Sequence, residues 1–180
     1  MLAAELEKYS EIIQKYNINI SSIMTINGEN ILHIAARKNN VELINYLINN
    51  NFDINSRDKN GNTALFYAIS SAGPNINWEV PFFENNTSFY VNTLSVQTRG
   101  DPGFPNIQAQ RERSDKIINT IRILCENGIE LNAQNNLGWT ALHLSYVKYS
   151  RVIRELLINY GANTYIKTRF GRLPEEFKIN

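Results

Sequence analysis

The chain has little of what most catalytic and metal-binding sites need. Its 180 residues include one cysteine, Cys125, and two histidines, His33 and His143. This set cannot form an internal disulfide, and it provides no cysteine and histidine cluster of the kind that binds zinc. Histidine is also the commonest general base, and neither a Ser/His/Asp set nor a phosphate-binding glycine loop is plausible in the sequence. We therefore expect a non-catalytic protein without metal or cofactor.

Long apolar runs and an excess of one charge are also absent. No run reaches the ~18 apolar residues needed to span a bilayer, and the formal net charge is only +1. Nucleic-acid and membrane-surface binding normally need a concentrated basic face. The first residues, MLAAELEKYSEIIQKY, lack the basic and then apolar pattern of a signal peptide. We expect a cytoplasmic protein, in a host cell's cytosol if it is a secreted effector or viral protein, that binds neither nucleic acid nor membrane.

What the chain does contain is a repeat phased by glycine. Gly28 and Gly61 are 33 residues apart, and so are Gly138 and Gly171. Gly61 and Gly138 are separated by 77 residues, which is one period plus 44 extra residues. A period of this size indicates a stack of supersecondary units, with one interruption.

Each unit has the pattern of two short helices and a projecting turn. Gly128 and Gly161, and Asn51 in the first unit, follow the second helix, where a left-handed residue closes the last carbonyls. Cys125 falls at an inward position of a second helix and is expected to act as a small buried hydrophobe. Three residues are expected to cap the first helices with a side-chain oxygen: Asn30, Thr63 and Thr140.

These units resemble the ankyrin repeat, whose consensus begins roughly G-x-T-P-L-H-x-A-A. The corresponding stretches here are GENILHIAA, GNTALFYAI and GWTALHLSY. The consensus proline is absent from all three, and Phe66 replaces the histidine of the second unit. The resemblance implies an all-α solenoid, histidines that act as structural hydrogen-bond bridges, and protein partners that contact the projecting turns and the first helices.

The predicted organisation is a single domain spanning residues 1–180. An N-terminal cap (1–27) precedes a full repeat (28–60), a split repeat (61–71 and 116–137), a further repeat (138–170) and a C-terminal cap (171–180). The insertion that splits the second full repeat covers residues 72–115.

The insertion differs in composition from the rest of the chain. It contains four of the five prolines and six aromatic residues. Two or three buried aromatics, each contributing roughly 1.5–3 kcal/mol, would offset the entropy of closing so long a loop. The bulky Ile69 and Tyr146 stand where the first unit has the small Ala36. We therefore expect an ordered insertion that packs near these two residues.

The leading functional hypothesis is a protein–protein interaction module that is monomeric alone and binds one protein through its turns, first helices and insertion. An inhibitor or immunity-type protein that blocks a partner enzyme is a narrower form of the same idea. A small-ligand binder or enzyme with a pocket in the insertion is the alternative, and so is a surface covered by the insertion or by a neighbouring turn. The candidate partner-binding residues are Tyr67, Trp78, Phe82, Phe83, Phe89, Tyr90, Leu137, Trp139, Leu144, Lys148, Phe170 and Arg172.

Overall fold

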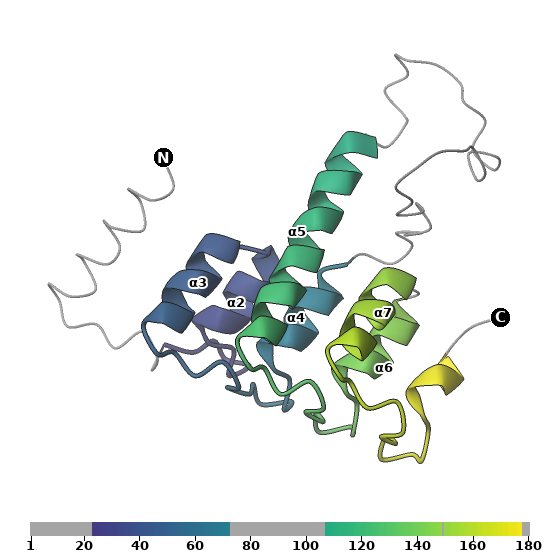
Figure 1. Cartoon of the computed structure of the whole chain (residues 1–180). Coiled ribbons are helices and arrows are strands. Elements are labelled where there is room, and N and C mark those ends of the chain that lie inside the picture. The colour runs from purple at the N-terminus through teal and green to yellow at the C-terminus, as the bar shows by residue number, and fades with distance from the viewer. Residues whose placement is uncertain (1–22, 73–106, 149, 178–180) are drawn as a thin grey trace, which may run out of the picture.

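The structure is a computed structural model and describes residues 23–72, 107–148 and 150–177 (Figure 1). The described residues form α-helices and one short 3-10 helix, and they contain no strand. None of these helices combines the length and the apolar character that crossing a bilayer requires. The elements in chain order are α2 (Ile31–Lys38), α3 (Val41–Asn49), α4 (Ala64–Ser70), α5 (Ile107–Glu126), α6 (Ala141–Val147), α7 (Arg151–Asn159) and η2 (Pro174–Phe177).

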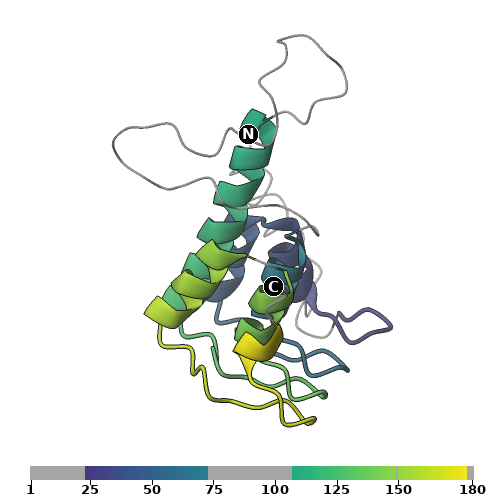
Figure 2. The same ribbon diagram turned by 90° about the vertical axis from the view of Figure 1, so that its right-hand side faces the viewer.

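Three helix pairs stack side by side, which confirms the predicted all-α solenoid. The first helices, α2, α4 and α6, form one layer, and the second helices, α3, α5 and α7, form the other (Figures 1 and 2). The turns between pairs project together from one side of the stack (Figure 2). We call these projecting turns the fingers: residues 58–62, 135–139 and 168–172.

Local sequence explains where the helices begin and end. Asn30 Oδ1 accepts the backbone N–H of His33 at 3.1 Å, and Asn40 Oδ1 accepts that of Leu43 at 3.0 Å. These bonds satisfy donors that have no partner inside the helix. The second helices end at the left-handed residues that the sequence predicts, Asn51, Gly128 and Gly161, with φ values of 58°, 84° and 94°.

The core lies between the two layers and is made mainly of branched aliphatic side chains. In the first layer, the small Ala35, Ala36 and Ala68 are buried, and α2 and α4 pack closely. Each large apolar side chain removed from water contributes roughly 1.5–3 kcal/mol. The fully buried side chains of the second layer are Ile44, Leu47, Ile117, Ile121, Leu124, Ile153 and Leu157.

The boundaries of the insertion differ from the prediction of residues 72–115. Helix α5 begins at Ile107, well before the expected restart at residue 116, and Ala72 belongs to the buried core. The repeat period placed the restart at 116, but the segment IQAQRERSDK is rich in good helix formers and extends the helix toward its N-terminus. The Arg113 guanidinium then joins α5 to the end of α4 by donating to the carbonyl of Ser71 at 2.9 Å.

The two bulky residues that suggested contact with the insertion are accommodated by the described helices. Ile69 is fully buried in the core, and Tyr146 packs against the core with the Arg154 guanidinium 4.8 Å from its ring centroid. Residues 73–106 lie outside the described part of the chain. Packing of that segment near Ile69 and Tyr146 therefore stays a prediction.

Backbone hydrogen bonds join each finger to the next. The amide of Lys59 donates to Asn27 O at 3.0 Å, in the corresponding turn before α2, and the amide of Asn136 donates to Asn60 O at 2.8 Å. The last such bond runs from Arg169 N to Leu137 O at 3.1 Å. The fingers thus form a continuous ladder that fixes the spacing of the repeats.

Glycine at position 138 is required for this close approach. Gly138 has a φ of 77°, and a Cβ atom there would lie 2.5 Å from the backbone nitrogen of Arg169. Gly128 has a similar φ of 84° but open space around it. Positive φ alone costs a residue with a Cβ atom about 1–2 kcal/mol. The clash at Gly138 adds to that cost.

We predict that Gly138→Ala destabilises the protein by about 2–5 kcal/mol, because strain and a backbone clash act together. Gly128→Ala is the matched control and should cost only about 1–2 kcal/mol. Urea denaturation of both variants measures the difference. Equal losses would show that the fingers do not need this close contact.

Candidate functional site

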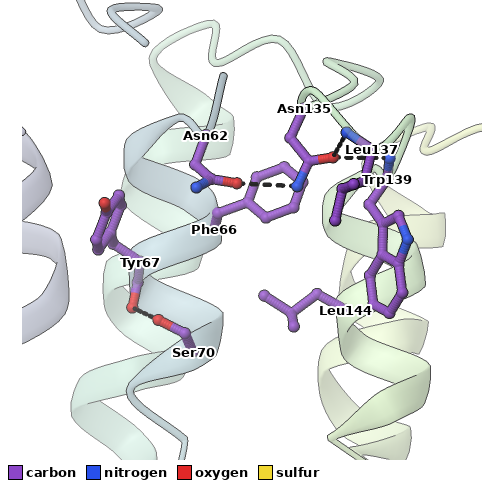
Figure 3. A pocket seen from close by; sticks show the side chains of 8 residues that line it. All are labelled: Asn62, Phe66, Tyr67, Ser70, Asn135, Leu137, Trp139 and Leu144. Atoms are coloured by element: carbon purple, nitrogen blue, oxygen red, sulfur yellow. Dashed lines mark hydrogen bonds between the residues drawn. The ribbon is translucent and has the colours of Figure 1, made fainter. Parts of the chain in front are cut away.

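An open groove of about 280 Å³ lies between α4 and α6, beside the bases of the fingers (Figure 3). Phe66 and Leu144 extend toward each other from the two helices, and Trp139 lies beside Leu144. The complete lining is Asn62, Phe66, Tyr67, Ser70, Asn135, Leu137, Trp139 and Leu144. The groove is therefore mainly aromatic and aliphatic, and its polar groups include two side-chain amides and the hydroxyls of Tyr67 and Ser70.

Histidine bridges join successive units where they are present. His33 Nδ1 accepts the backbone N–H of Asn30 at 3.1 Å, which leaves the proton on Nε2. Nε2 then donates to the carbonyl of Asn62 in the next unit at 3.1 Å. His143 repeats this arrangement with Thr140 N at 3.1 Å and Arg172 O at 3.3 Å. Each imidazole thus fixes the start of its own helix and holds the following finger.

The second unit has no such bridge, because Phe66 replaces the histidine. A phenyl ring can neither accept the N–H of Thr63 nor donate to Trp139 O, which stands where the other units have Asn62 O and Arg172 O. Thr63 occupies the N-cap of α4, but its side chain makes no capping bond, and its buried Oγ1 has no partner in the structure. The predicted capping role of Thr63 is therefore wrong. Thr140 also makes no side-chain cap bond to a backbone N–H, but its hydroxyl, unlike that of Thr63, has a partner, His143 Nδ1 at 2.8 Å.

The missing bridge coincides with the groove. Helices α4 and α6 contact each other less extensively than α2 and α4 do. Phe66 itself is buried and forms part of the wall of the groove. The groove therefore opens at the junction of described units that lacks a histidine bridge.

Side-chain amides close the groove on its finger side. Asn135 Nδ2 donates to Asn62 Oδ1 at 3.0 Å, and Asn62 Nδ2 donates to Asp58 Oδ2 at 3.0 Å (Figure 3 shows the first bond). Asn135 Oδ1 also accepts the backbone N–H groups of Leu137 and Trp139, each at 3.0 Å. These amides satisfy one another and the finger backbone.

The Tyr67 hydroxyl is also engaged, with the Asp58 carboxylate at 2.7 Å. Burial and this hydrogen bond raise the pKa of Tyr67 above its ordinary value of 10.0. Burial works to raise the pKa of Asp58, but hydrogen bonds from Tyr67 and Asn62 outweigh it and hold that pKa below 3.8. Tyr67 therefore presents a neutral ring to the groove, and the Asp58 charge stays within the finger base.

Four predicted partner-binding residues line this one groove: Tyr67, Leu137, Trp139 and Leu144. Leu137 is 53% exposed, whereas Trp139 is half-buried with its ring centroid 4.7 Å from that of Phe177. Asn62, which the repeat pattern places on the same outward surface, also lines the groove, whereas Phe66, Asn135 and Ser70 were not predicted from the sequence. The replacement of histidine by Phe66 was the available signal for them.

The remaining candidates lie around the groove or outside the described residues. Lys148 is the C-cap of α6, and Arg172 places its guanidinium 4.3 Å from the ring centroid of Phe177. Phe170 is 78% exposed at the tip of the last finger. The insertion candidates and the pocket expected from them lie outside the described residues: Trp78, Phe82, Phe83, Phe89 and Tyr90.

The described residues offer binding contacts more readily than reactive groups. No group of three or more His, Cys, Asp and Glu side chains among them could hold a metal ion. Cys125 is half-buried rather than fully buried and packs against the core, and burial raises the pKa of its thiol to about 12. The thiol is therefore protonated and weakly nucleophilic near neutral pH.

We predict opposite effects of the same substitution at the two N-cap threonines. Thr140→Val removes the hydroxyl bonded to His143 and should cost about 1 kcal/mol. That cost corresponds to roughly 2–4 °C in Tm for a chain of this size. Thr63→Val removes a buried hydroxyl without a partner and should be neutral or stabilising. If Thr63→Val lowered the stability as much as Thr140→Val does, the absence of a bridge in the second unit would be contradicted.

We also predict that stability falls as the pH falls through the histidine range. Burial lowers the pKa of His33 and His143 below 6.5. The unfolded chain then binds more protons below pH 6.5, so acidification favours unfolding. The charge of Asp58 contributes at every pH above 3.8 and adds no slope here. Tm should decline from pH 7.5 to 5, less steeply in His143→Asn, and a Tm that is constant over this range would contradict the buried bridges.

Comparison with known proteins agrees with this architecture. The family model described as ankyrin repeats (3 copies) matches residues 1–77, and the ankyrin repeat model matches residues 137–169. Together they match more than half of the chain. Ankyrin repeats generally mediate protein–protein interactions, and the family is generally non-catalytic.

Two similar proteins come from fowlpox virus (strain NVSL). The ankyrin repeat protein FPV034 is 26% identical over 172 residues, which cover 95% of this chain and 38% of the viral protein. The ankyrin repeat protein FPV230 is 41% identical over 59 residues, covering 33% of this chain and 30% of that protein. The matched parts thus span about a third of each relative's length. Since both family models and both relatives match a chain whose helix pairs repeat in phase with its glycines, the chain belongs to the ankyrin repeat proteins.

Proposed function

We propose that this chain binds a protein partner without catalysis and that the partner contacts the groove between α4 and α6. The observation that carries the proposal is the aromatic and aliphatic lining of that groove at the bases of the fingers. Monomeric proteins keep few contiguous apolar patches exposed, and such patches often mark partner sites. Trp and Tyr, two of the residue types that dominate binding energy in interfaces, both line it.

The polar part of the lining supports the same function. The amides of Asn62 and Asn135 are bonded to each other and to the finger, and the Ser70 hydroxyl donates to the carbonyl of Tyr67 at 3.0 Å. An apolar side chain entering the groove would not have to break these bonds. The desolvation cost of stranding a polar atom, about 1–3 kcal/mol, is thereby avoided.

The size and shape favour a protein side chain over a free small molecule. Small-molecule sites usually enclose about 300–1,000 Å³ and bury most of the ligand. The groove is smaller, at about 280 Å³, and open to solvent. A site of this kind suits one large apolar side chain whose backbone runs along the outside of the stack. Contacts with Lys148, Arg172 and Phe170 would then extend the interface beyond the groove.

The test begins with a photo-crosslinking amino acid, p-benzoyl-phenylalanine, at position 137, where the native side chain is exposed. The same probe at position 158, on α7, is the matched control, because Ile158 is also exposed and apolar. A partner crosslinked at 137 and not at 158 supports the groove. Crosslinking at 158 alone would place the interface on the second helices and contradict the proposal.

We predict that Leu137→Ala weakens the captured partner's binding by roughly 5–30-fold, the equivalent of about 1–2 kcal/mol at an apolar contact. Ile158→Ala should leave the affinity unchanged. Because Leu137 lies outside the buried core, its substitution should leave Tm near that of the parent protein. Calorimetric titration measures the affinities, and an unchanged Kd for Leu137→Ala would overturn the assignment.

A further inference from the structure

The two helices that form the groove carry no charged side chain. The sequences of α4 and α6 are ALFYAIS and ALHLSYV. Two carboxylates on the finger and α2 side are buried and already engaged, Asp58 with Tyr67 and Asn62, and Glu29 with Arg37 and Thr25. A partner side chain entering the groove therefore meets an uncharged surface.

The first unneutralised cation beside the groove is Lys148. It lies four residues after Leu144, and its backbone N–H donates to the carbonyl of Leu144 at 2.9 Å. Residues separated by four positions share one face of a helix, so Lys148 extends the face on which Leu144 lines the groove. None of the three ion pairs formed by the described residues involves Lys148.

The second cation lies on the opposite, cap side. Arg172 stacks on Phe177, and Phe177 in turn contacts Trp139, which lines the groove. Arg172 donates to the backbone carbonyl of Glu176 at 2.9 Å, so its charge is held in place without being neutralised. The Glu176 carboxylate instead accepts the N–H of Leu173.

A third cation, Arg37, contributes less positive charge to the surroundings of the groove. Its guanidinium lies 4.7 Å from the ring centroid of Tyr67, on the α2 side of the groove. It is also paired with the Glu29 carboxylate, which offsets most of its field. The rim therefore combines an uncharged centre with cations at the C-terminal end of α6 and at the cap.

From this arrangement we infer that the partner presents a short segment with one large apolar side chain flanked by aspartate or glutamate. The inference rests on the proposed function and specifies the chemistry of the ligand. The apolar side chain occupies the groove, and the flanking carboxylates face Lys148 and Arg172. Charges at the rim of an interface mainly raise the association rate and select the partner. They act within a Debye length of about 8 Å at physiological ionic strength.

The test uses a phage library of random 12-residue peptides, selected against the full chain. Peptides enriched by the parent protein should contain Leu, Met, Phe, Tyr or Trp, with more Asp and Glu near that residue than the unselected library has. The double variant Lys148→Glu and Arg172→Glu, which we call the rim variant, should enrich peptides that contain the same apolar residues with Lys and Arg beside them. Lys148→Glu alone, which leaves the Phe177 contact intact, should shift the flanking charge in the same direction by less.

The matched control is Lys116→Glu and Arg122→Glu, two exposed residues of α5. This variant changes the net charge of the chain by the same amount as the rim variant, on the other layer of the stack. It should retain the acidic preference. Circular dichroism melts of all variants verify that each one is folded.

Kinetics provide a second measurement. A synthetic peptide with the enriched sequence should associate with the rim variant at least tenfold more slowly than with the parent protein at 50 mM salt. The difference should largely disappear at 500 mM, because added salt screens the rim charges. An equal difference at both salt concentrations would contradict an electrostatic role.

The outcomes separate the two proposals. Apolar peptides without an acidic preference, an acidic preference unchanged in the rim variant, or no enriched peptide would overturn the inference. The groove would remain a binding site if Leu137→Ala still weakened binding of the natural partner. Enriched peptides that bind equally well to Leu137→Ala and Leu144→Ala would overturn the groove itself, and the inference with it.

Discussion

The stack depends on a hydrogen bond that crosses from one unit to the next through an imidazole ring. A neutral histidine has one acceptor and one donor nitrogen in a fixed geometry. His33 uses the first to cap its own helix and the second to hold the finger of the following unit. Each unit contacts only its neighbours in a repeat protein, so stability is approximately a sum of unit and interface contributions. Losing one bridge therefore weakens one interface and leaves the others intact.

The second unit shows what replaces the bridge. Phe66 keeps the apolar bulk of the position and forfeits both hydrogen bonds, and the buried Thr63 hydroxyl is left without a partner. The second and third units are still joined through their fingers, by Asn136 N to Asn60 O and by Asn135 to Asn62. These bonds lie at one end of the helices, so the fingers stay joined while α4 and α6 pack less closely. The unit that lacks the bridge is also the one beside the open apolar groove, and departures from a protein's own pattern are often found at functional sites.

The sequence predicts most of the fold because each recurring residue has one physical task. The left-handed Asn51, Gly128 and Gly161 could be placed from the need for positive φ at the end of a helix. The start of α5 could not be placed in this way. The repeat period describes the helix lengths of a typical unit, whereas the helix propensity of residues 107–115 lengthens this helix at its N-terminus. The Thr63 hydroxyl lacks a partner for a related reason: its counterpart Thr140 bonds to the imidazole three positions later, and in the second unit that residue is Phe66.

The candidate site is harder to derive, because a groove is a property of the distance between two helices. Tyr67, Leu137, Trp139 and Leu144 could be named from their positions on the fingers and first helices, since the repeat pattern places those surfaces outward. That they line one groove follows from the packing of α4 against α6, at the junction where Phe66 replaces the histidine. Phe66 thus bears on two properties, the hydrogen bonding between units and the apolar character of the groove. A histidine at 66 would place a hydrogen-bonding imidazole in a wall of the groove that Phe66 now makes apolar. In this chain the apolar groove lies at the junction without a bridge, and His33 and His143 keep the bridges on either side of it.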